Sequence, residues 1–160
     1  MIKIFATGGT FDKDYDEKNG RLYFKKTHMN EILALGRSKV EVRVETLMML
    51  DSLDMKEKDR NLIIEKCKTT NEDQIVITHG TDTMINTAKA LGAKNFKKTI
   101  VLTGAMIPYK FGTSDGLFNI ASALAYVQTM PHGVYIAMNG RVFKYHEVIK
   151  NKETGIFEEK

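Results

Sequence analysis

The chain of 160 residues contains one cysteine, two prolines and no tryptophan, and it has no long apolar stretch. The single cysteine, Cys67, cannot form an internal disulfide and cannot hold a metal ion alone, so we expect no metal site. A membrane-spanning helix needs about 20 consecutive apolar residues, so we expect no membrane association. The N-terminus also lacks the basic, apolar and small-residue segments of a secretory signal. These absences predict a soluble, cytoplasmic protein.

The charge is only mildly basic, with 24 Lys and Arg against 20 Asp and Glu and a net charge of +4. A nucleic-acid binder gathers its basic residues in one stripe with aromatic residues interleaved. Here the basic residues at 25–26, 97–98 and 144–152 are scattered and interrupted by acids. We therefore expect no nucleic-acid partner.

The composition is that of a globular domain, with 42% hydrophobic and 28% charged residues. A chain of this length buries roughly 70% of the surface that its unfolded form exposes, so one sizeable core is feasible. No internal repeat or linker divides the sequence. We expect a single domain over residues 1–160.

Apolar runs alternate with helical patterns along the whole length. Runs typical of strands cover Ile2–Thr7, Val40–Leu50, Gln74–Thr78, Thr99–Thr103 and Gly133–Met138. Helical patterns cover residues 28–35, 54–67, 81–91 and 114–126, and a capping box formed by Asp54 and Glu57 is expected to begin the second helix. The alternation predicts an α/β fold with a doubly wound, mostly parallel sheet and helices on both faces. The second strand alternates polar and apolar residues, which predicts half exposure.

Glycine and hydroxyl residues follow the predicted strands, at the end where ligands bind in such sheets. They lie in residues 7–10, 51–54, 78–83, 103–106 and 139–140. Glycines let the backbone turn tightly and approach a ligand, and exposed amides then bind a carboxylate or an oxyanion. The plainer interpretation is a set of tight turns in which Thr10 and Thr81 cap helices. The glycine-rich phosphate-binding patterns are absent after the first strand, so a nucleotide site is not indicated.

Three of these segments resemble the signatures of the bacterial-type L-asparaginase family. Ile4–Thr10 (IFATGGT) is similar to the first signature and Ile77–Met84 (ITHGTDTM) to the second. Thr103–Pro108, followed by 114–116 and Asn119, is similar to a third stretch. Order and spacing also match, and the resemblance covers almost the whole chain. It implies the fold of the N-terminal catalytic domain of that family.

The resemblance implies hydrolysis of L-asparagine to L-aspartate and ammonia, with weaker activity on L-glutamine and without a metal or organic cofactor. Its implied catalytic residues are Thr10, Tyr23, Thr81, Asp82 and Lys150. Its implied substrate-binding residues are Gly9, Ser52, Gly80, Thr81, Asp82 and Ala105. The threonine matching Thr10 is the nucleophile, and water then hydrolyses the acyl-enzyme. Such a hydroxyl needs a partner that orients or deprotonates it, and a hydrogen-bonded line of Asp82, Thr81 and Lys150 would supply one.

Several alternatives remain open at the level of residues. Tyr15 lies on the same predicted loop as Tyr23 and competes with it for the loop-tyrosine role. Lys110 competes with Lys150 as the lysine of the site. His79 is expected to end a strand and satisfy the backbone, with a general-base role as the alternative. Asp82 either orients Lys150 or binds the ammonium group of the substrate.

Full-length members of the resembled family carry a second, smaller domain, whereas this chain ends at Lys160. We expect a short asparaginase whose site is covered by further copies in a homodimer or homotetramer. A non-catalytic amino-acid-binding or sensor domain on the same scaffold is the alternative from another class. An amidase module that delivers ammonia to a partner enzyme is a third hypothesis.

Overall fold

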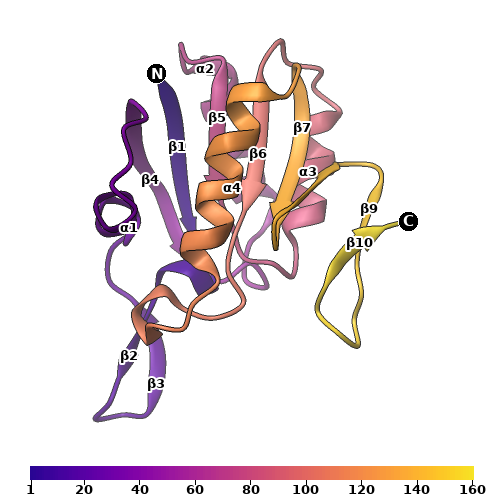
Figure 1. The fold of residues 1–160 in the computed structure, drawn as a ribbon. Coiled ribbons are helices and arrows are strands. Elements are labelled where there is room, and N and C mark those ends of the chain that lie inside the picture. The colour runs from indigo at the N-terminus through magenta and orange to yellow at the C-terminus, as the bar shows by residue number, and fades with distance from the viewer.

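The computed structural model describes all residues from 1 to 160. A six-stranded sheet runs through the middle of the protein (Figure 1). Its spatial order is β4 (Val42–Leu50), β1 (Ile2–Gly8), β5 (Gln74–Thr78), β6 (Thr99–Thr103), β7 (Gly133–Met138) and β8 (Arg141–Lys144). The first five strands are parallel, and β8 runs antiparallel to β7 at one edge. The predicted doubly wound sheet is therefore confirmed. β4, the alternating strand, lies half-exposed at the other edge.

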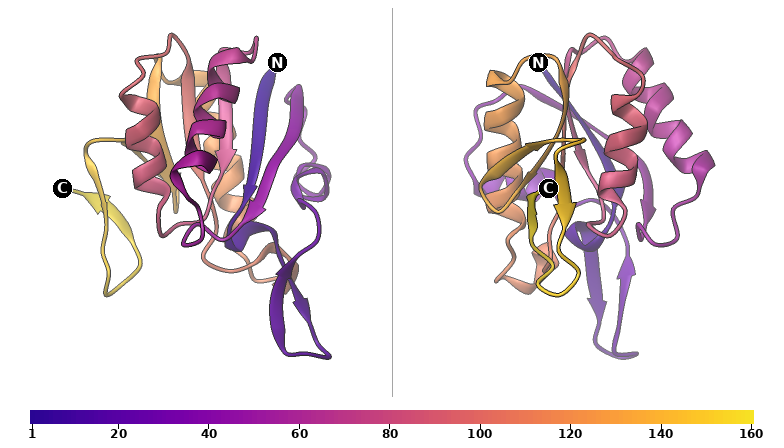
Figure 2. Two further views of the ribbon diagram at one scale, coloured as in Figure 1. Left: turned by 180° about the vertical axis from the view of Figure 1, so that it is seen from behind. Right: turned by 90° about the vertical axis from the view of Figure 1, so that its right-hand side faces the viewer.

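Two helices cover each face of the sheet (Figure 2). α1 (Met29–Leu35) and α4 (Gly116–Thr129) pack on one face, and α2 (Glu57–Thr69) and α3 (Met84–Gly92) pack on the other. Successive strand residues serve opposite faces, so Ile4 belongs to the α1–α4 core and Phe5 to the α2–α3 core. None of these helices combines the length and apolarity that crossing a membrane requires.

The order of the strands places a topological switch point between β1 and β5. The chain leaves β1 for β4 on one side and then returns to β5 on the other side. At such a point the connections diverge to opposite faces, and open sheets of this kind bind ligands outside the carboxyl ends of the two strands. The segments after β1 and β5 contain Thr10 and Thr81, so both threonines lie at this end of the sheet.

Two predicted helix starts are wrong. The expected capping box of Asp54 and Glu57 does not form, because the Asp54 N–H closes a turn onto the carbonyl of Asp51. α2 instead begins at Glu57, and the Asp59 carboxylate accepts the N–H of Lys56 at 2.9 Å. α3 begins at Met84 rather than at residue 81, so Thr81 and Asp82 stay in the turn before the helix.

Two hairpins project from the sheet and were not predicted (Figures 1 and 2). β2 (Lys13–Asp16) pairs with β3 (Arg21–Phe24), and β9 (Val148–Lys150) pairs with β10 (Phe157–Glu159). The Asn19-Gly20 pair was the available turn signal for the first hairpin. Short 3-10 turns, η1 (Thr10–Asp12) and η2 (Tyr109–Phe111), complete the fold.

Candidate active site at the carboxyl ends of the strands

Glycine contacts bring three strand ends together at the switch point. A Cβ on Gly9 would lie 2.4 Å from the Gly80 nitrogen, and a Cβ on Gly80 would lie 2.5 Å from Ser52 Oγ. The Gly9 N–H also donates to the carbonyl of Leu50 at 2.8 Å. Because no side chain fits between these backbones, the loops after β1, β4 and β5 converge. Thr10 directly follows one of these glycines and Thr81 the other.

Two threonines at the ends of strands, Thr7 and Thr103, bond to neighbouring strands. Thr7 donates its hydroxyl proton to the carbonyl of Thr78 at 2.7 Å, and Thr103 donates to that of Ala137 at 2.8 Å. Both side chains are fully buried. Their hydroxyls therefore fasten neighbouring strands together beneath the site. The sequence pattern did not distinguish this structural role from a catalytic or binding role.

Lys150 connects the C-terminal hairpin to the loop after β5. Its ammonium donates to Thr81 Oγ1 at 3.0 Å and to Asp82 Oδ1 at 2.7 Å. The lysine side chain is 18% exposed and that of Asp82 is 49% exposed, so the pair lies at the rim of the protein. Lys150 is thus joined to Thr81 and Asp82, which lie far from it in the sequence, as the resemblance implied. The catalytic roles of the three residues stay predictions.

The hydroxyl proton of Thr81 has only a weak partner within the protein. Its nearest acceptor is the sulfur of Met106, at 3.6 Å. A thioether is a poor hydrogen-bond acceptor, so this proton is free to turn toward a better one. Thr81 does not cap α3, whose N-cap is Thr83, and the capping interpretation of Thr81 is wrong.

Ser52 presents a buried hydroxyl without a protein partner. The residue is 1% exposed, and its Oγ makes no hydrogen bond within the chain. Its carbonyl accepts the hydroxyl of Thr83 at 2.8 Å, which fixes the loop after β4 against the start of α3. Buried polar atoms are almost always hydrogen-bonded, and Ser52 Oγ is one of the few here that is free to bond to a ligand.

The third matched stretch forms the side of the site next to β6. The Asp115 carboxylate accepts the N–H groups of Met106 and Ile107 at 3.0 Å. The Asn119 amide donates to the carbonyl of Gly104 at 2.9 Å. These bonds hold the loop that carries Ala105, which is buried. The start of α4 therefore shapes this loop.

Thr10 opens η1 and is half-buried, and its hydroxyl makes no hydrogen bond within the protein. Gly9, and not Thr10, is the residue that precedes the turn, so Thr10 is not a cap. Thr10 and Thr81 flank the same contact between Gly9 and Gly80, but no hydrogen bond joins them.

Tyr23 and Tyr15 both lie on the β2–β3 hairpin, which replaces the predicted loop. Asp14 pairs with Tyr23 across the hairpin and Tyr15 pairs with Leu22, so the two tyrosines occupy opposite faces. Tyr15 packs its ring edge-on against Phe111. Both rings are exposed, and neither hydroxyl bonds to the residues around Thr81. The structure thus does not bring either tyrosine to the site, and the choice between them stays open.

The rival side chains considered from the sequence lie elsewhere or are already engaged. Lys110 pairs with Glu31 at 3.0 Å, and Lys150 is the lysine that contacts Thr81. The two ring nitrogens of His79 lie 2.8 Å from the Gly80 carbonyl and 2.8 Å from the Thr87 hydroxyl. Burial lowers the pKa of His79 to about 4, so the ring is neutral and structural.

The lone thiol takes no part in the site. Burial raises the pKa of the Cys67 thiol to about 12, so it stays protonated and unreactive. No group of His, Cys, Asp and Glu is arranged to hold a metal ion.

Asp12, two residues beyond Thr10, is a fully buried acid. Burial raises its pKa from 3.8 to about 6, against the lowering effect of hydrogen bonds from His28 and Thr27. The folded state therefore holds a proton on this group over a range where the unfolded state does not. Its contribution to the free energy of unfolding is present at low pH and is lost as pH rises from about 4 to 6.

Replacing Asp12 with asparagine should remove this pH-dependent loss. A change from 3.8 to about 6 corresponds to about 3 kcal/mol, so D12N should gain about that much relative to the unmodified protein between pH 4 and 7. His79 shifts stability in the opposite direction, but it does so in both proteins and cancels in the difference. Urea denaturation of both proteins at pH 4 and 7 measures this difference. A difference that stays constant over this range would contradict the expectation.

Comparison with known proteins relates almost the whole chain to one protein family. The family model described as "Asparaginase, N-terminal" matches residues 1–157. L-asparaginase 1 of Escherichia coli K12 is 35% identical over 164 residues, which cover 96% of this chain and 48% of that protein. A glutamyl-tRNA(Gln) amidotransferase component from Methanococcus maripaludis is 32% identical over 145 residues, which cover 87% of this chain and 35% of that protein.

Solved structures show the same arrangement. The thermostable L-asparaginase from Thermococcus kodakarensis superposes with a TM-score of 0.87 at 28% identity, covering 99% of this chain and 50% of that one. L-asparaginase I from Vibrio cholerae gives a TM-score of 0.86 at 26% identity, with the same coverage. The chain thus spans about half the length of the asparaginases that it matches.

Proposed function

This chain belongs to the asparaginase family and matches its N-terminal domain, and we propose that it hydrolyses L-asparagine at the side-chain amide to give L-aspartate and ammonia. The observation that carries the proposal is the contact of Lys150 with both Thr81 and Asp82 at the switch point of the sheet. Lys150 comes from a separate hairpin late in the chain, and its contact has no role in filling the core. Weaker activity on L-glutamine, which has the same amide on a longer side chain, belongs to the same proposal.

In the proposed reaction, Thr10 Oγ1 attacks the amide carbon of the substrate side chain. The Thr10 proton passes to the leaving nitrogen, the C–N bond breaks, and ammonia departs from an aspartyl ester on Thr10. Water then attacks the ester carbonyl, the C–O bond to Thr10 breaks, and the hydroxyl regains its proton. One asparagine and one water thus become one aspartate and one ammonia, with no oxidant, reductant or metal in the balance.

The remaining residues would orient the reactants and stabilise charge. Lys150 holds the Thr81 hydroxyl oxygen by donation, so the Thr81 proton, whose acceptor in the protein is the weak Met106 sulfur, can instead be donated to the substrate or to the attacking water. The backbone N–H group of Gly80 suits the oxyanion that forms in each step. The unpaired hydroxyl of Ser52 suits the α-carboxylate of the substrate, and the half-exposed Asp82 suits its ammonium group.

The test is ammonia release from L-asparagine by the purified protein, from micromolar to tens of millimolar substrate, beside the Thr10→Ala variant. We expect saturable release that falls by orders of magnitude in the variant. Absence of release from the parent protein, with asparagine or aspartate still raising its melting temperature, would favour the binding or sensor domain instead. Equal release by parent and variant would exclude Thr10 as the nucleophile.

A second candidate function is ammonia delivery to a partner enzyme. It is favoured by the match to components of glutamyl-tRNA(Gln) amidotransferases from two Methanococcus species, which covers most of this chain. In that case release from the free protein would be slow and would rise when the partner enzyme is added. For either function we propose that further copies of the chain cover the site in a homodimer or homotetramer.

A further inference from the structure

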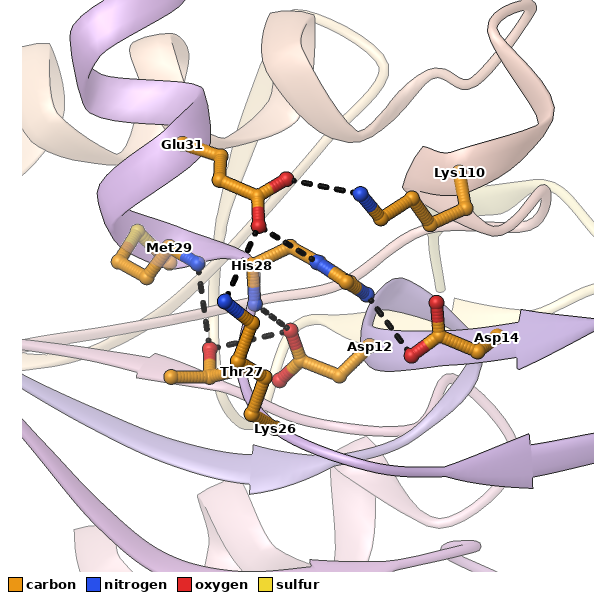
Figure 3. Close-up of polar contacts among 8 residues, drawn as sticks. All are labelled: Asp12, Asp14, Lys26, Thr27, His28, Met29, Glu31 and Lys110. Atoms are coloured by element: carbon orange, nitrogen blue, oxygen red, sulfur yellow. Dashed lines mark hydrogen bonds and ion pairs between the residues drawn. The ribbon is translucent and has the colours of Figure 1, made fainter.

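The base of the β2–β3 hairpin is held by one buried carboxylate (Figure 3). The chain enters the hairpin at Asp12 and leaves it at Thr27 and His28. Asp12 Oδ1 accepts the Thr27 hydroxyl at 3.0 Å and the His28 backbone N–H at 2.9 Å. These three residues form what we call the hairpin clasp. It joins the two legs of the hairpin where they meet the body of the protein.

Charged groups surround the clasp and secure it from three elements (Figure 3). The His28 ring places Nε2 3.2 Å from Asp14 Oδ2 on β2 and Nδ1 3.5 Å from Glu31 Oε1 on α1. Glu31 also pairs with Lys110 of η2 at 3.0 Å and with Lys26 at 3.5 Å. Two buried atoms here, Asp12 Oδ2 and His28 Nδ1, make no hydrogen bond. Only Oδ1 of Asp12 therefore serves the clasp.

The clasp is continuous with the turn that presents Thr10. The Asp12 backbone N–H donates to the Gly9 carbonyl at 3.2 Å and closes η1 around Thr10. One residue thus closes this turn through its backbone and fastens the hairpin through its side chain. The hairpin base and the Thr10 turn thus share Asp12, which is fully buried.

We propose that Asp12 is a positioning residue, whose hydrogen bonds to Thr27 and His28 hold the Thr10 turn in a fixed relation to the hairpin that carries Tyr23. The inference rests on the proposed function, because it assigns Asp12 its effect through Thr10. The clasp uses the acceptor geometry of Oδ1, which an asparagine side chain retains and an alanine side chain loses. Asp12→Asn therefore distinguishes the effect of the hydrogen bonds from the effect of the negative charge.

The hairpin itself is tested without any reference to activity. The chain has no tryptophan, and Leu22 at the hairpin is exposed, so Leu22→Trp places a single fluorescent reporter there. In this background we expect Asp12→Ala to lower the fluorescence anisotropy of the reporter and Asp12→Asn to leave it near the parent value. Unchanged anisotropy in a folded Asp12→Ala protein would overturn the clasp, whether or not the protein hydrolyses asparagine.

The effect on the reaction is tested by kinetics at saturating and limiting asparagine. Misplacing a reacting group by about 1 Å costs on the order of 100-fold, so Asp12→Ala should lower kcat by roughly 10- to 100-fold. We expect KM to change by less than about threefold, because Ser52 and Asp82 lie on other loops. Asp12→Asn should restore most of the lost kcat. If Asp12→Asn is as slow as Asp12→Ala with unchanged anisotropy, the charge acts and the positioning role is wrong.

A milder variant keeps the test valid if Asp12→Ala does not fold. Thr27→Val removes one of the two donors to Asp12, together with the acceptor of the Met29 N–H at 3.3 Å, and preserves the shape of the side chain. Thr69→Val is the matched control, because Thr69 is exposed and bonds only to its own helix. We expect lower anisotropy and lower kcat in Thr27→Val but not in Thr69→Val. Equal behaviour of the two variants would overturn the proposal.

Discussion

Replacing Thr81 with valine should lower asparagine turnover by about 10³-fold or more while the protein keeps its fold. The Thr81 hydroxyl is the only side-chain group that accepts from Lys150 and still has a proton without a strong acceptor. Removing a comparable catalytic donor costs on the order of 10² to 10³ in other enzymes, and removing a triad member costs more. Initial rates of ammonia release, with circular dichroism as the check on folding, measure the effect.

The dependence of Thr81 on Lys150 is tested by a double-mutant cycle. Lys150→Met removes the donor to both Thr81 and Asp82. If the three residues act as one unit, the double variant should be about as slow as the slower single variant. Thr129→Val is the control, because that hydroxyl is exposed and bonds only within α4. Additive losses in the cycle would show that Thr81 and Lys150 act independently, against the proposed arrangement.

Replacing Gly9 with alanine should destabilise the protein by about 3 kcal/mol or more. Gly9 has φ of 72° and ψ of −178°, a conformation almost restricted to glycine, which by itself costs another residue about 1–3 kcal/mol. The new Cβ would also lie 2.4 Å from the backbone nitrogen of Gly80, where no flexible side chain can move aside. Thermal or urea denaturation measures the loss.

Gly20 provides the matched control for this substitution. It also has a positive φ, 63°, but a Cβ there would meet no atom within 4 Å. Gly20→Ala should therefore cost only about 1–2 kcal/mol, the ordinary penalty of the left-handed conformation. If both alanine variants lose the same stability, backbone contact between Gly9 and Gly80 is not what brings the strand ends together.

The parallel strands of the central sheet were predicted from the sequence, whereas the hairpin at residues 13–24 and the start of α2 were not. Continuous apolar runs such as Gln74–Thr78 have the composition of strands buried on both faces, so their place in the sheet followed from the residues. The hairpin at residues 13–24 has exposed, mixed residues and no comparable pattern. The capping box at Asp54 failed because a competing turn, the Asp54 N–H to the Asp51 carbonyl, satisfies the same group.

Some residues of the candidate site were likewise predicted from the sequence, and others were not. The resemblance to the asparaginase family grouped Thr10, Thr81 and Lys150 in one predicted site. The sequence pattern did not distinguish the threonines that fasten strands, Thr7 and Thr103, from Thr10 and Thr81, because all of them follow strands. Nor did it single out Asp12, whose importance depends on partners at Thr27 and His28 that only folding supplies.

The sequence by itself determined the class of the fold and the family to which the chain belongs, and it predicted the edge of the sheet at which a ligand binds. These depend on local composition and on motifs whose residues are close together in the chain. Tertiary structure alone decided that Lys150 contacts Thr81, that Lys110 does not, and that Ser52 is buried without a partner. Each of these facts is a contact or an absence of contact between segments far apart in the sequence. Such contacts are set by how the strands order themselves around the switch point and by the close approach of glycine backbones there.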